Sequence, residues 1–327
     1  MSQALLAMMG AGSLAVPTYV DDVFSAYTYT GNGSTQTITN GINLSTSGGM
    51  VWIKGRSNTG NNAIHDTVRG ATNYLYADTT VAAATYADSV TAFNSNGFSL
   101  GVDGVGYWNT GSRTYVSYTF RKAARFFDVV TYTGDGVNRT VSHSLGQVPG
   151  MIMVKRTNST GSWMVYHRSL TSNVYNLVLN TTAAETSNAT AWNSTTATSS
   201  VFSLGTHADV NTNGATYVAY LFAHDTGADG LIQCGSFTTD GSGGATVNHG
   251  WSSGVQFALI KCSSTTGGWE MYDTARTSGW TGSDARLRAN LNDAEDAVTR
   301  LSVSGTSVTF AGLSNSATYI YMFITAP

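Results

Sequence analysis

The sequence predicts an all-β protein made of three tandem homologous antiparallel β-sandwich domains, jelly-roll-like, after a short N-terminal arm. Two observations support this fold class. First, four landmarks recur three times in the same order, which indicates an internal repeat. Second, short apolar runs alternate with turns rich in Gly, Ser, Thr and Asn, and no helical periodicity extends much beyond about ten residues.

The first landmark is a tight-turn dipeptide after the opening strand of each copy. It is Asn32-Gly33 in the first copy, Asp135-Gly136 in the second and Asp240-Gly241 in the third. These residue types tolerate positive φ, so the dipeptide predicts a β-hairpin. A calcium loop is the alternative, but the first copy has Asn here and no copy supplies the series of oxygen ligands that calcium requires.

The second landmark is an apolar strand that ends in lysine. These lysines recur at intervals of 101 and 106 residues, at Lys54, Lys155 and Lys261. A polar turn and a second strand follow each of them, which predicts another hairpin. Recurrence in all three copies favours a role in the fold over contact with a ligand, with the stem buried and the ammonium reaching a carboxylate or a carbonyl.

The last two landmarks lie toward the end of each copy. A Phe-Ser-Leu-Gly motif at residues 98–101 returns at 202–205 and has a weaker echo at 301–304. An aromatic-rich strand then closes each copy. Its first tyrosine recurs at a constant interval of 102 residues, at Tyr115, Tyr217 and Tyr319.

These intervals predict three domains of similar size joined by short linkers. A domain of about 100 residues can bury a core without disulfides or metals. Short linkers should pack the domains against one another. The domains are expected at residues 23–122, 126–225 and 231–327, after an N-terminal arm at residues 1–22.

The composition argues against some partners. Only 11% of the 327 residues are charged, compared with about 25% in ordinary soluble domains, and the net charge is −3. Lys and Arg are dispersed and form no basic stripe, so we expect no nucleic-acid partner. A surface rich in Ser, Thr, Asn and Gly forms hydrogen bonds without charge, which is common in fibres and extracellular assemblies.

The N-terminal arm is apolar between residues 4 and 16 and ends at Pro17. No Lys or Arg precedes this run, as a secretory signal requires, and the run is shorter than the about 20 residues of a membrane span. We therefore expect no membrane insertion and infer that the arm docks on a partner protein. The side chains expected to dock are Leu5, Leu6, Met8, Met9 and Leu14.

No catalytic constellation emerges from the sequence, so we expect no enzymatic activity, no cofactor and no metal. A glycosidase needs two carboxylates, for which Asp66 with Asp88 or Asp273 with Glu270 could be nominated. Across the repeat, however, Asp66 and Asp273 align with His167, which cannot act as a carboxylate. We instead expect each aspartate to cap a turn or to pair with the arginine three residues later. The six histidines share no metal-ligand spacing.

Two cysteines, Cys234 and Cys262, lie on separate expected strands of the third domain. A small buried hydrophobic residue is favoured over a disulfide at each position. The sequence leaves their pairing open.

Tryptophans supply the candidate ligand-binding residues. Trp163 and Trp269 align just after the turn that follows the lysine, and we expect them to be packing residues. Trp108, Trp192 and Trp280 lie in polar contexts without a common register. Exposed aromatics among Asn and Thr side chains stack on sugar faces, so these three are candidates for contact with a host-surface glycan. The alternative is that each plugs a loop against its own domain or a neighbouring subunit.

Long irregular segments lie in the middle of each copy, for example at residues 181–200 and 292–300. They are the most variable part of the repeat. Because binding residues on a rigid sandwich usually lie on such loops, we expect binding functions here.

The middle copy carries the clearest set of motifs, at residues 132–136, 145–155, 163–167 and 217–222. Together they resemble a repeat domain of tailed-bacteriophage virion proteins, with relatives among tail-fibre-like and other structural proteins of marine phages and cyanophages. The resemblance covers residues 24–324. The first and third copies depart from it where the apolar strand begins, because Ser47-Gly48-Gly49 and Ser253-Gly254-Val255 replace Val148-Pro149-Gly150.

This resemblance implies a virion component, assembled in the cytoplasm of a bacterial host, with no transferable catalytic residues. The most specific expectation is a tail-fibre or appendage subunit. Such a subunit would dock on other virion proteins through its arm, contact the host surface and self-associate as a homotrimer. A capsid decoration protein or a collar (neck) protein without a receptor role is the alternative, and a polysaccharide depolymerase is least favoured.

Overall fold

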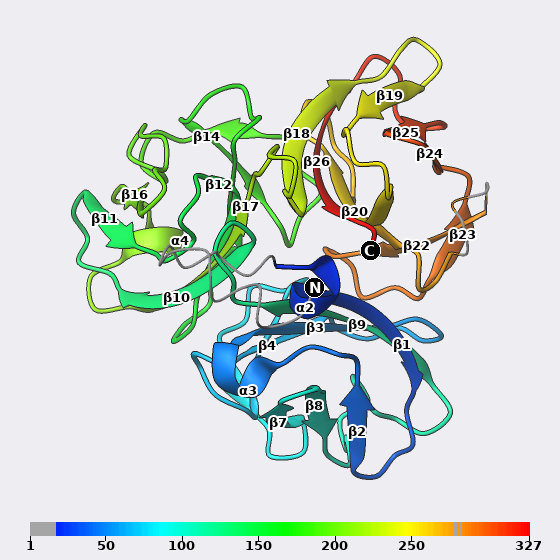
Figure 1. Ribbon diagram of the computed structural model, residues 1–327. Helices are drawn as coiled ribbons and strands as arrows, with labels where there is room; N and C mark the ends of the chain where they lie inside the picture. The colour runs from blue at the N-terminus through cyan, green and yellow to red at the C-terminus, as the bar shows by residue number, and fades with distance from the viewer. Residues whose placement is uncertain (1–17, 278–279, 281–282) are drawn as a thin grey trace, which may run out of the picture.

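The structure is a computed structural model, which describes residues 18–277, 280 and 283–327. It confirms the all-β fold class, and the strand pairs in its sheets are antiparallel. The strands fall into three consecutive units, which we call unit 1 (residues 24–121), unit 2 (127–223) and unit 3 (232–325). Figure 1 shows the three units around a common centre, with unit 1 in blue to cyan, unit 2 in green and unit 3 in yellow to red.

The described elements are short. Unit 1 and the segment before it contain α2 (Val20–Val23), β1 (Phe24–Thr30), β2 (Gln36–Thr39), α3 (Leu44–Ser47), β3 (Gly49–Gly55), β4 (Ala63–Asp66), β5 (Asn73–Tyr76), β6 (Ala84–Thr85), β7 (Val90–Asn94), β8 (Gly97–Leu100) and β9 (Thr114–Arg121). Unit 2 contains β10 (Phe127–Thr133), β11 (Arg139–Ser142), β12 (Pro149–Arg156), β13 (Met164–His167), β14 (Tyr175–Val178), β15 (Thr186–Ser187), β16 (Val201–Leu204), α4 (Ala208–Asn211) and β17 (Thr216–Ala223). Unit 3 contains β18 (Ile232–Thr238), β19 (Ala245–Asn248), β20 (Val255–Cys262), β21 (Trp269–Asp273), β22 (Asp284–Arg288), β23 (Asp296–Val298), β24 (Leu301–Ser304), β25 (Ser307–Phe310) and β26 (Thr318–Thr325).

Each unit consists of a six-stranded sheet and a small sheet. The large sheets have the same strand order in all three units: β1-β9-β3-β4-β5-β6, β10-β17-β12-β13-β14-β15 and β18-β26-β20-β21-β22-β23. The small sheets are β2-β8-β7, β11-β16 and β19-β25-β24. In every unit the aromatic-rich closing strand returns to lie between the first strand and the lysine-bearing strand, as β9 does between β1 and β3.

The tight turn after the opening strand does not form the expected hairpin. β1 pairs with β9 and β2 pairs with β8, so Asn32-Gly33 carries the chain from the large sheet to the small sheet. Asp135-Gly136 and Asp240-Gly241 do the same in units 2 and 3. In each turn the Asn or Asp side chain accepts a hydrogen bond from the backbone N–H two residues later, at 2.8, 3.1 and 2.8 Å. This side-chain turn has the same sequence signature as a hairpin turn. The hairpins expected after the lysines are confirmed in all three units.

The central strands of the large sheets are buried on both faces. In β9, Tyr115 belongs to the core inside unit 1, whereas Val116, Tyr118 and Phe120 belong to a cluster that includes residues of all three units. β26 divides in the same way, because alternate side chains of a strand point to opposite faces. Burial on both faces explains the continuous apolar runs of the sequence.

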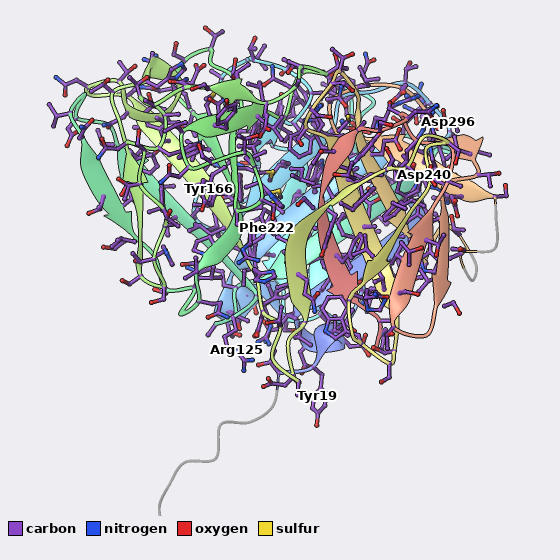
Figure 2. The ribbon with its side chains drawn as sticks, turned by 90° about the horizontal axis from the view of Figure 1, so that it is seen from above. Tyr19, Arg125, Tyr166, Phe222, Asp240 and Asp296 are labelled. Carbon is purple, nitrogen blue, oxygen red and sulfur yellow. The ribbon has the colours of Figure 1, made fainter. Side chains whose placement is uncertain are left out.

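The centre of the molecule is a cluster of phenylalanine rings that we call the central core: Phe24 and Phe120 of unit 1, Phe127 and Phe222 of unit 2, and Phe257 of unit 3. The ring centroids of Phe120 and Phe222 are 5.3 Å apart, and those of Phe24 and Phe257 are 5.4 Å apart. Ring pairs of this kind contribute about 0.5–1.5 kcal/mol beyond the burial of their area. Phe222 is fully buried and is labelled near the middle of the view in Figure 2.

We predict that Phe120→Ala lowers the free energy of unfolding by about 3–5 kcal/mol. The removed ring would leave a cavity between phenylalanine rings of all three units. Denaturant-induced unfolding measures this change. Val137→Ala is the control, since Val137 is 60% exposed and its truncation should stay within about 0.5 kcal/mol of the parent. Similar losses for the two variants would contradict the proposed importance of the central core.

Candidate functional site

Three equivalent junctions join the units in a closed ring. Each junction involves the hairpin that follows the repeated lysine of one unit, which we call the lysine hairpin. The turn of this hairpin meets the segment that follows the fifth strand (β5, β14 or β22) of a neighbouring unit. The backbone N–H of a glycine in the turn donates to a carbonyl of the neighbour: Gly60 to Asn292 at 2.7 Å, Gly161 to Thr80 at 2.9 Å and Gly267 to Thr182 at 2.9 Å. Three return bonds, each of 2.8 Å, run from Ala83 to Thr157, from Glu185 to Ser263 and from Glu295 to Arg56. Unit 1 thus contacts unit 3, unit 3 contacts unit 2 and unit 2 contacts unit 1, which gives an approximate threefold arrangement.

The three repeated lysines lie at these junctions. Their Nζ atoms donate to backbone carbonyls of the neighbouring unit: Lys54 to Leu291 at 2.8 Å, Lys155 to Thr80 at 2.9 Å and Lys261 to Thr182 at 3.3 Å. All three side chains are fully buried, and burial lowers the pKa of each ammonium group to about 8. The expected role in the fold is confirmed, and the carbonyl that each lysine binds proves to belong to another unit.

A second side chain of each hairpin crosses the same junction. It donates a hydrogen bond to the fifth strand of the neighbour or to the residue that follows that strand: Asn62 Nδ2 to the Ala289 carbonyl at 2.9 Å, Trp163 Nε1 to Tyr76 at 2.9 Å and Trp269 Nε1 to Val178 at 3.1 Å. Trp163 and Trp269 are buried, as expected for packing residues. The donor in unit 1 is an amide, so a tryptophan alignment alone could not identify this position.

Buried carboxylates complete two of the junctions. Each aspartate accepts a hydrogen bond from the arginine three residues later and another from a tyrosine of the next unit: Asp66 from Arg69 at 2.6 Å and Tyr220 at 2.6 Å, Asp273 from Arg276 at 2.6 Å and Tyr118 at 2.8 Å. The expected Asp–Arg pairing is therefore confirmed. Burial raises the pKa of both tyrosines well above the ordinary value, so both remain hydrogen-bond donors.

The third junction uses a histidine instead. His167 occupies the aspartate position at the end of β13, and Met322 occupies the tyrosine position of unit 3. His167 Nδ1 accepts the Ser169 N–H at 3.2 Å, so the neutral ring carries its proton on Nε2 and donates it to the Tyr321 carbonyl at 3.1 Å. Burial lowers the pKa of this imidazole to about 3.

The segments at residues 181–200 and 292–300 are thus not simply free binding loops. Thr182 and Asn292, at the start of these segments, are held by the hairpin of a neighbouring unit. The sequence did contain a signal for this contact, because a glycine follows each repeated lysine at a constant distance of six residues. That glycine donates the backbone hydrogen bond across the junction.

A cavity of about 580 Å³, which we call the base cavity, lies where unit 3 begins and ends. Its wall consists of residues 18–21, 226–231, 233, 249–253 and 325–327. Arg125 reaches this wall and forms an ion pair of 2.7 Å with Asp229. Tyr19 and Arg125 lie at the same end of the molecule in Figure 2.

Two buried N–H donors in the wall of the base cavity have no acceptor among the described residues: His249 Nε2 and Trp251 Nε1. The side chains are 4% and 8% exposed. His249 Nδ1 accepts the Trp251 N–H at 3.2 Å, so the neutral ring carries its proton on the unpaired Nε2. Burial lowers the pKa of His249 and keeps the ring neutral. An unsatisfied buried donor costs about 1–3 kcal/mol, and both nitrogens have almost no accessible surface.

The three tryptophans nominated for glycan contact are buried. Trp108, Trp192 and Trp280 are 0%, 2% and 5% exposed. Trp108 Nε1 donates to the Asp88 carbonyl at 3.2 Å, and Trp280 Nε1 donates to the Val255 carbonyl at 2.8 Å. The expectation of an exposed ring face is wrong, because the rings fill space inside their own units. Polar neighbours in the sequence did not indicate exposure.

Other sequence expectations concern chemistry and docking. Within the described ranges, no group of three or more His, Cys, Asp or Glu residues could hold a metal ion, and no helix is long and apolar enough to span a bilayer. Cys234 and Cys262 are buried and unbridged. The arm residues nominated for docking lie outside the described residues, so their role stays a prediction: Leu5, Leu6, Met8, Met9 and Leu14.

Comparisons with known proteins give one family match. A family described as "Domain of unknown function (DUF7483)" matches residues 20–327. No curated protein matches the chain. A solved structure described as "Crystal Structure of the STIV MCP" is similar over 61% of this chain and 95% of that chain, at 10% sequence identity and a TM-score of 0.21. A TM-score this low carries no argument about fold or function.

We predict that Tyr220→Phe lowers the free energy of unfolding by about 1–3 kcal/mol, because the buried Asp66 carboxylate loses a hydrogen bond from the neighbouring unit. Tyr27→Phe is the matched control, since Tyr27 is 38% exposed on β1. Denaturant unfolding of both variants tests the prediction. Equal stability of the two variants would show that the bond across the junction contributes nothing.

We also predict that stability falls as the pH is lowered from 6.5 to 4.5. Burial lowers the pKa of His65 and His167 to about 3 and that of His224 to about 4, from 6.5. The unfolded chain therefore binds more protons below pH 6.5, so the stabilisation is complete above 6.5 and is lost toward the folded pKa. The free energy of unfolding can change by up to about 1.4 kcal/mol per pH unit for each such histidine.

Thermal unfolding midpoints across this pH range measure the effect. Glu295 and Asp296 have carboxyl pKa values that are lowered by arginine partners. The stability that they provide is lost only as the pH falls below their ordinary pKa values of 4.5 and 3.8, so they add little to the pH dependence above pH 4.5. His167→Gln should give a shallower pH dependence than the parent, because glutamine does not titrate. An identical slope would exclude His167 as a contributor.

Proposed function

The chain belongs to the family described as "Domain of unknown function (DUF7483)", and from that premise we propose that it is a structural protein of a tailed-phage virion. The observation that carries the proposal is the closed ring of junctions. Buried ionisable groups often indicate a catalytic site. Here the buried lysines, the Asp–Arg pairs and His167 all bind groups that hold the units together. Such a rigid block suits a building element of a particle, and we propose that it has no enzymatic activity.

More specifically, we propose a tail-fibre or appendage subunit that docks through its N-terminal arm. Support comes from the direction of the chain. Each unit begins and ends at one end of its large sheet, since Phe24 pairs with Phe120, Phe127 with Phe222 and Ile232 with Ile324. The described chain also starts at this end, beside the base cavity. The opposite end, with its Asn-Gly and Asp-Gly turns, is thereby left for contact with a host surface.

A capsid decoration or collar protein is the second candidate. The approximate threefold arrangement of the units favours it, because a single chain with three similar faces can fit a site of threefold symmetry. Self-association as a homotrimer is a separate proposal, tested by comparing the mass in solution with the 34.4 kDa of one chain. Release of oligosaccharides from host envelope material would contradict the absence of enzymatic activity.

We predict that deleting residues 1–17 abolishes incorporation into particles but leaves a folded protein in the cytoplasm of the host. The described fold begins at residue 18, so the deletion removes none of the described contacts. Mass spectrometry of purified particles measures incorporation. The control is Val137→Ser, at an exposed position of unit 2.

Normal incorporation of the deletion variant would overturn the docking role of the arm. Locating the parent protein on the particle by electron cryomicroscopy separates the two candidates. Density on the tail supports an appendage subunit, whereas density at threefold positions of the shell or at the neck supports the second candidate.

A further inference from the structure

Unit 3 contains a second cavity, of about 230 Å³, which we call the unit 3 cavity. Its wall includes three glycines and the side chains of Cys262, Glu270, Arg300, Leu313, Ser314 and Tyr319. Pockets that hold a whole drug-sized ligand measure about 300–1,000 Å³. The unit 3 cavity is smaller and therefore fits one small group, not an extended chain.

The repeat shows that the fold does not require a charge at Glu270. This residue pairs with Ile260, which directly precedes the repeated lysine of unit 3. At the same place in the lysine hairpin, unit 1 has Ala63 and unit 2 has Met164. Both of these side chains are apolar and buried. Unit 3 thus has a carboxylate where the other units have a packing residue.

Arg300 is the second charge that unit 3 adds. Its backbone carbonyl accepts the Ala311 N–H at 2.9 Å, and the equivalent bonds of units 1 and 2 end at the carbonyls of Ser89 and Ala191. Partial removal of ions from water costs free energy. Two charges where the other units have small or apolar residues therefore indicate a role beyond the fold.

The guanidinium of Arg300 is available to a ligand. Among the described residues its ion-pair partner is Glu270, 3.8 Å from Nε, and that carboxylate already accepts hydrogen bonds from Tyr272 at 2.5 Å and Arg286 at 2.8 Å. Nε itself has almost no accessible surface, but the side chain is 21% exposed, so a ligand would contact Nη1 and Nη2. Gly312 leaves room for Nη1, since a Cβ there would lie only 2.7 Å from it.

The unit 3 cavity lies at the end of the molecule that we propose faces the host. Leu313 in its wall donates its N–H to the carbonyl of Gly243, at 3.2 Å, just after the Asp240-Gly241 turn. Asp240 and Tyr19 are labelled toward opposite ends of the view in Figure 2. The cavity is therefore far from the base, where the described chain begins.

We propose that the unit 3 cavity binds one neutral sugar ring of a host-surface glycan. Each sugar hydroxyl both donates and accepts hydrogen bonds. Such hydroxyls can accept from Arg300 and donate to Glu270. Tyr319 Oη accepts the Ser314 N–H at 3.0 Å, so its own proton is free for a sugar oxygen. The two charges of the wall cancel, so the wall does not favour an ionic ligand.

This inference rests on the proposed contact with the host surface, and it names a site and a ligand class for that contact. It also moves the glycan site from the three buried tryptophans to polar side chains of unit 3. Sequence reasoning missed these residues because they meet only when the lysine hairpin and the small sheet of unit 3 come together.

Saturation-transfer NMR on the full chain tests the proposal. The probes are free D-glucose, D-galactose and D-mannose, with D-glucuronate as the charged comparison. We expect the parent protein to transfer saturation to at least one hexose, and to bind that hexose more tightly than glucuronate. Titration of the same signals gives the dissociation constants.

Two variants locate the binding site. Arg300→Ser introduces the side chain that unit 1 has at this position, and it should raise the dissociation constant at least about tenfold, because hydrogen bonds from a charged donor are lost. Ser314→Ala, at an exposed position, should raise it about two- to tenfold. Arg156→Ser is the control, since Arg156 is also partly buried but lies in unit 2 outside the cavity wall. Thermal unfolding of each variant checks that the fold is kept.

Three results would overturn the proposal. Failure of all three hexoses to bind the parent would exclude a neutral sugar. Tighter binding of glucuronate than of every hexose would assign the cavity to an acidic ligand. Equal dissociation constants for the parent, Arg300→Ser and Ser314→Ala would exclude the unit 3 cavity.

The position on the particle is measured separately by electron cryomicroscopy, so either proposal can fail alone. Sugar binding together with density on the shell or at the neck would support the site and contradict the appendage role. Density on the tail without sugar binding would support the appendage role and contradict the site.

Discussion

Burial of both faces of the large sheets is the constraint on which the structure depends. In units 1 and 3, the small sheet packs on one of these faces and forms a separate core there. The other face carries large apolar side chains, such as Tyr118 and Phe120 in unit 1, and water would contact it in an isolated unit. Three such faces around one centre cover one another at the same time. The units are therefore parts of one block, although each has its own pair of sheets.

Apolar burial is not directional, so it does not decide which hairpin meets which segment. We attribute that selection to the polar groups of the junctions. Each buried lysine needs acceptors for its protons, and the neighbouring segment supplies a carbonyl at a fixed place. The third junction illustrates the same requirement. Where Met322 replaces the tyrosine donor, His167 replaces the aspartate acceptor and donates to a backbone carbonyl.

Patterns of neighbouring residues in the sequence predicted the parts of the fold that depend on interactions between residues close in the chain. The repeat, the strands, the hairpins after the lysines and the Asp–Arg pairs could all be predicted from the sequence. The path of the chain after Asn32-Gly33 could not be predicted, because a side-chain turn between two sheets and a hairpin turn favour the same residue types. Polar neighbours suggested that Trp108, Trp192 and Trp280 are exposed, but burial depends on contacts made by distant segments. The junctions likewise form only when residues of different units come together, and the base cavity forms only when the segment before unit 1 meets residues in and around unit 3.

Native-state hydrogen exchange in increasing denaturant tests the central claim most directly. If the three units are one block, the most protected amides of β9, β17 and β26 should converge on a single free energy of opening with the same denaturant dependence. Three separate free energies, with one closing strand opening while the other two stay protected, would contradict this account. The units would then be independent domains that merely touch.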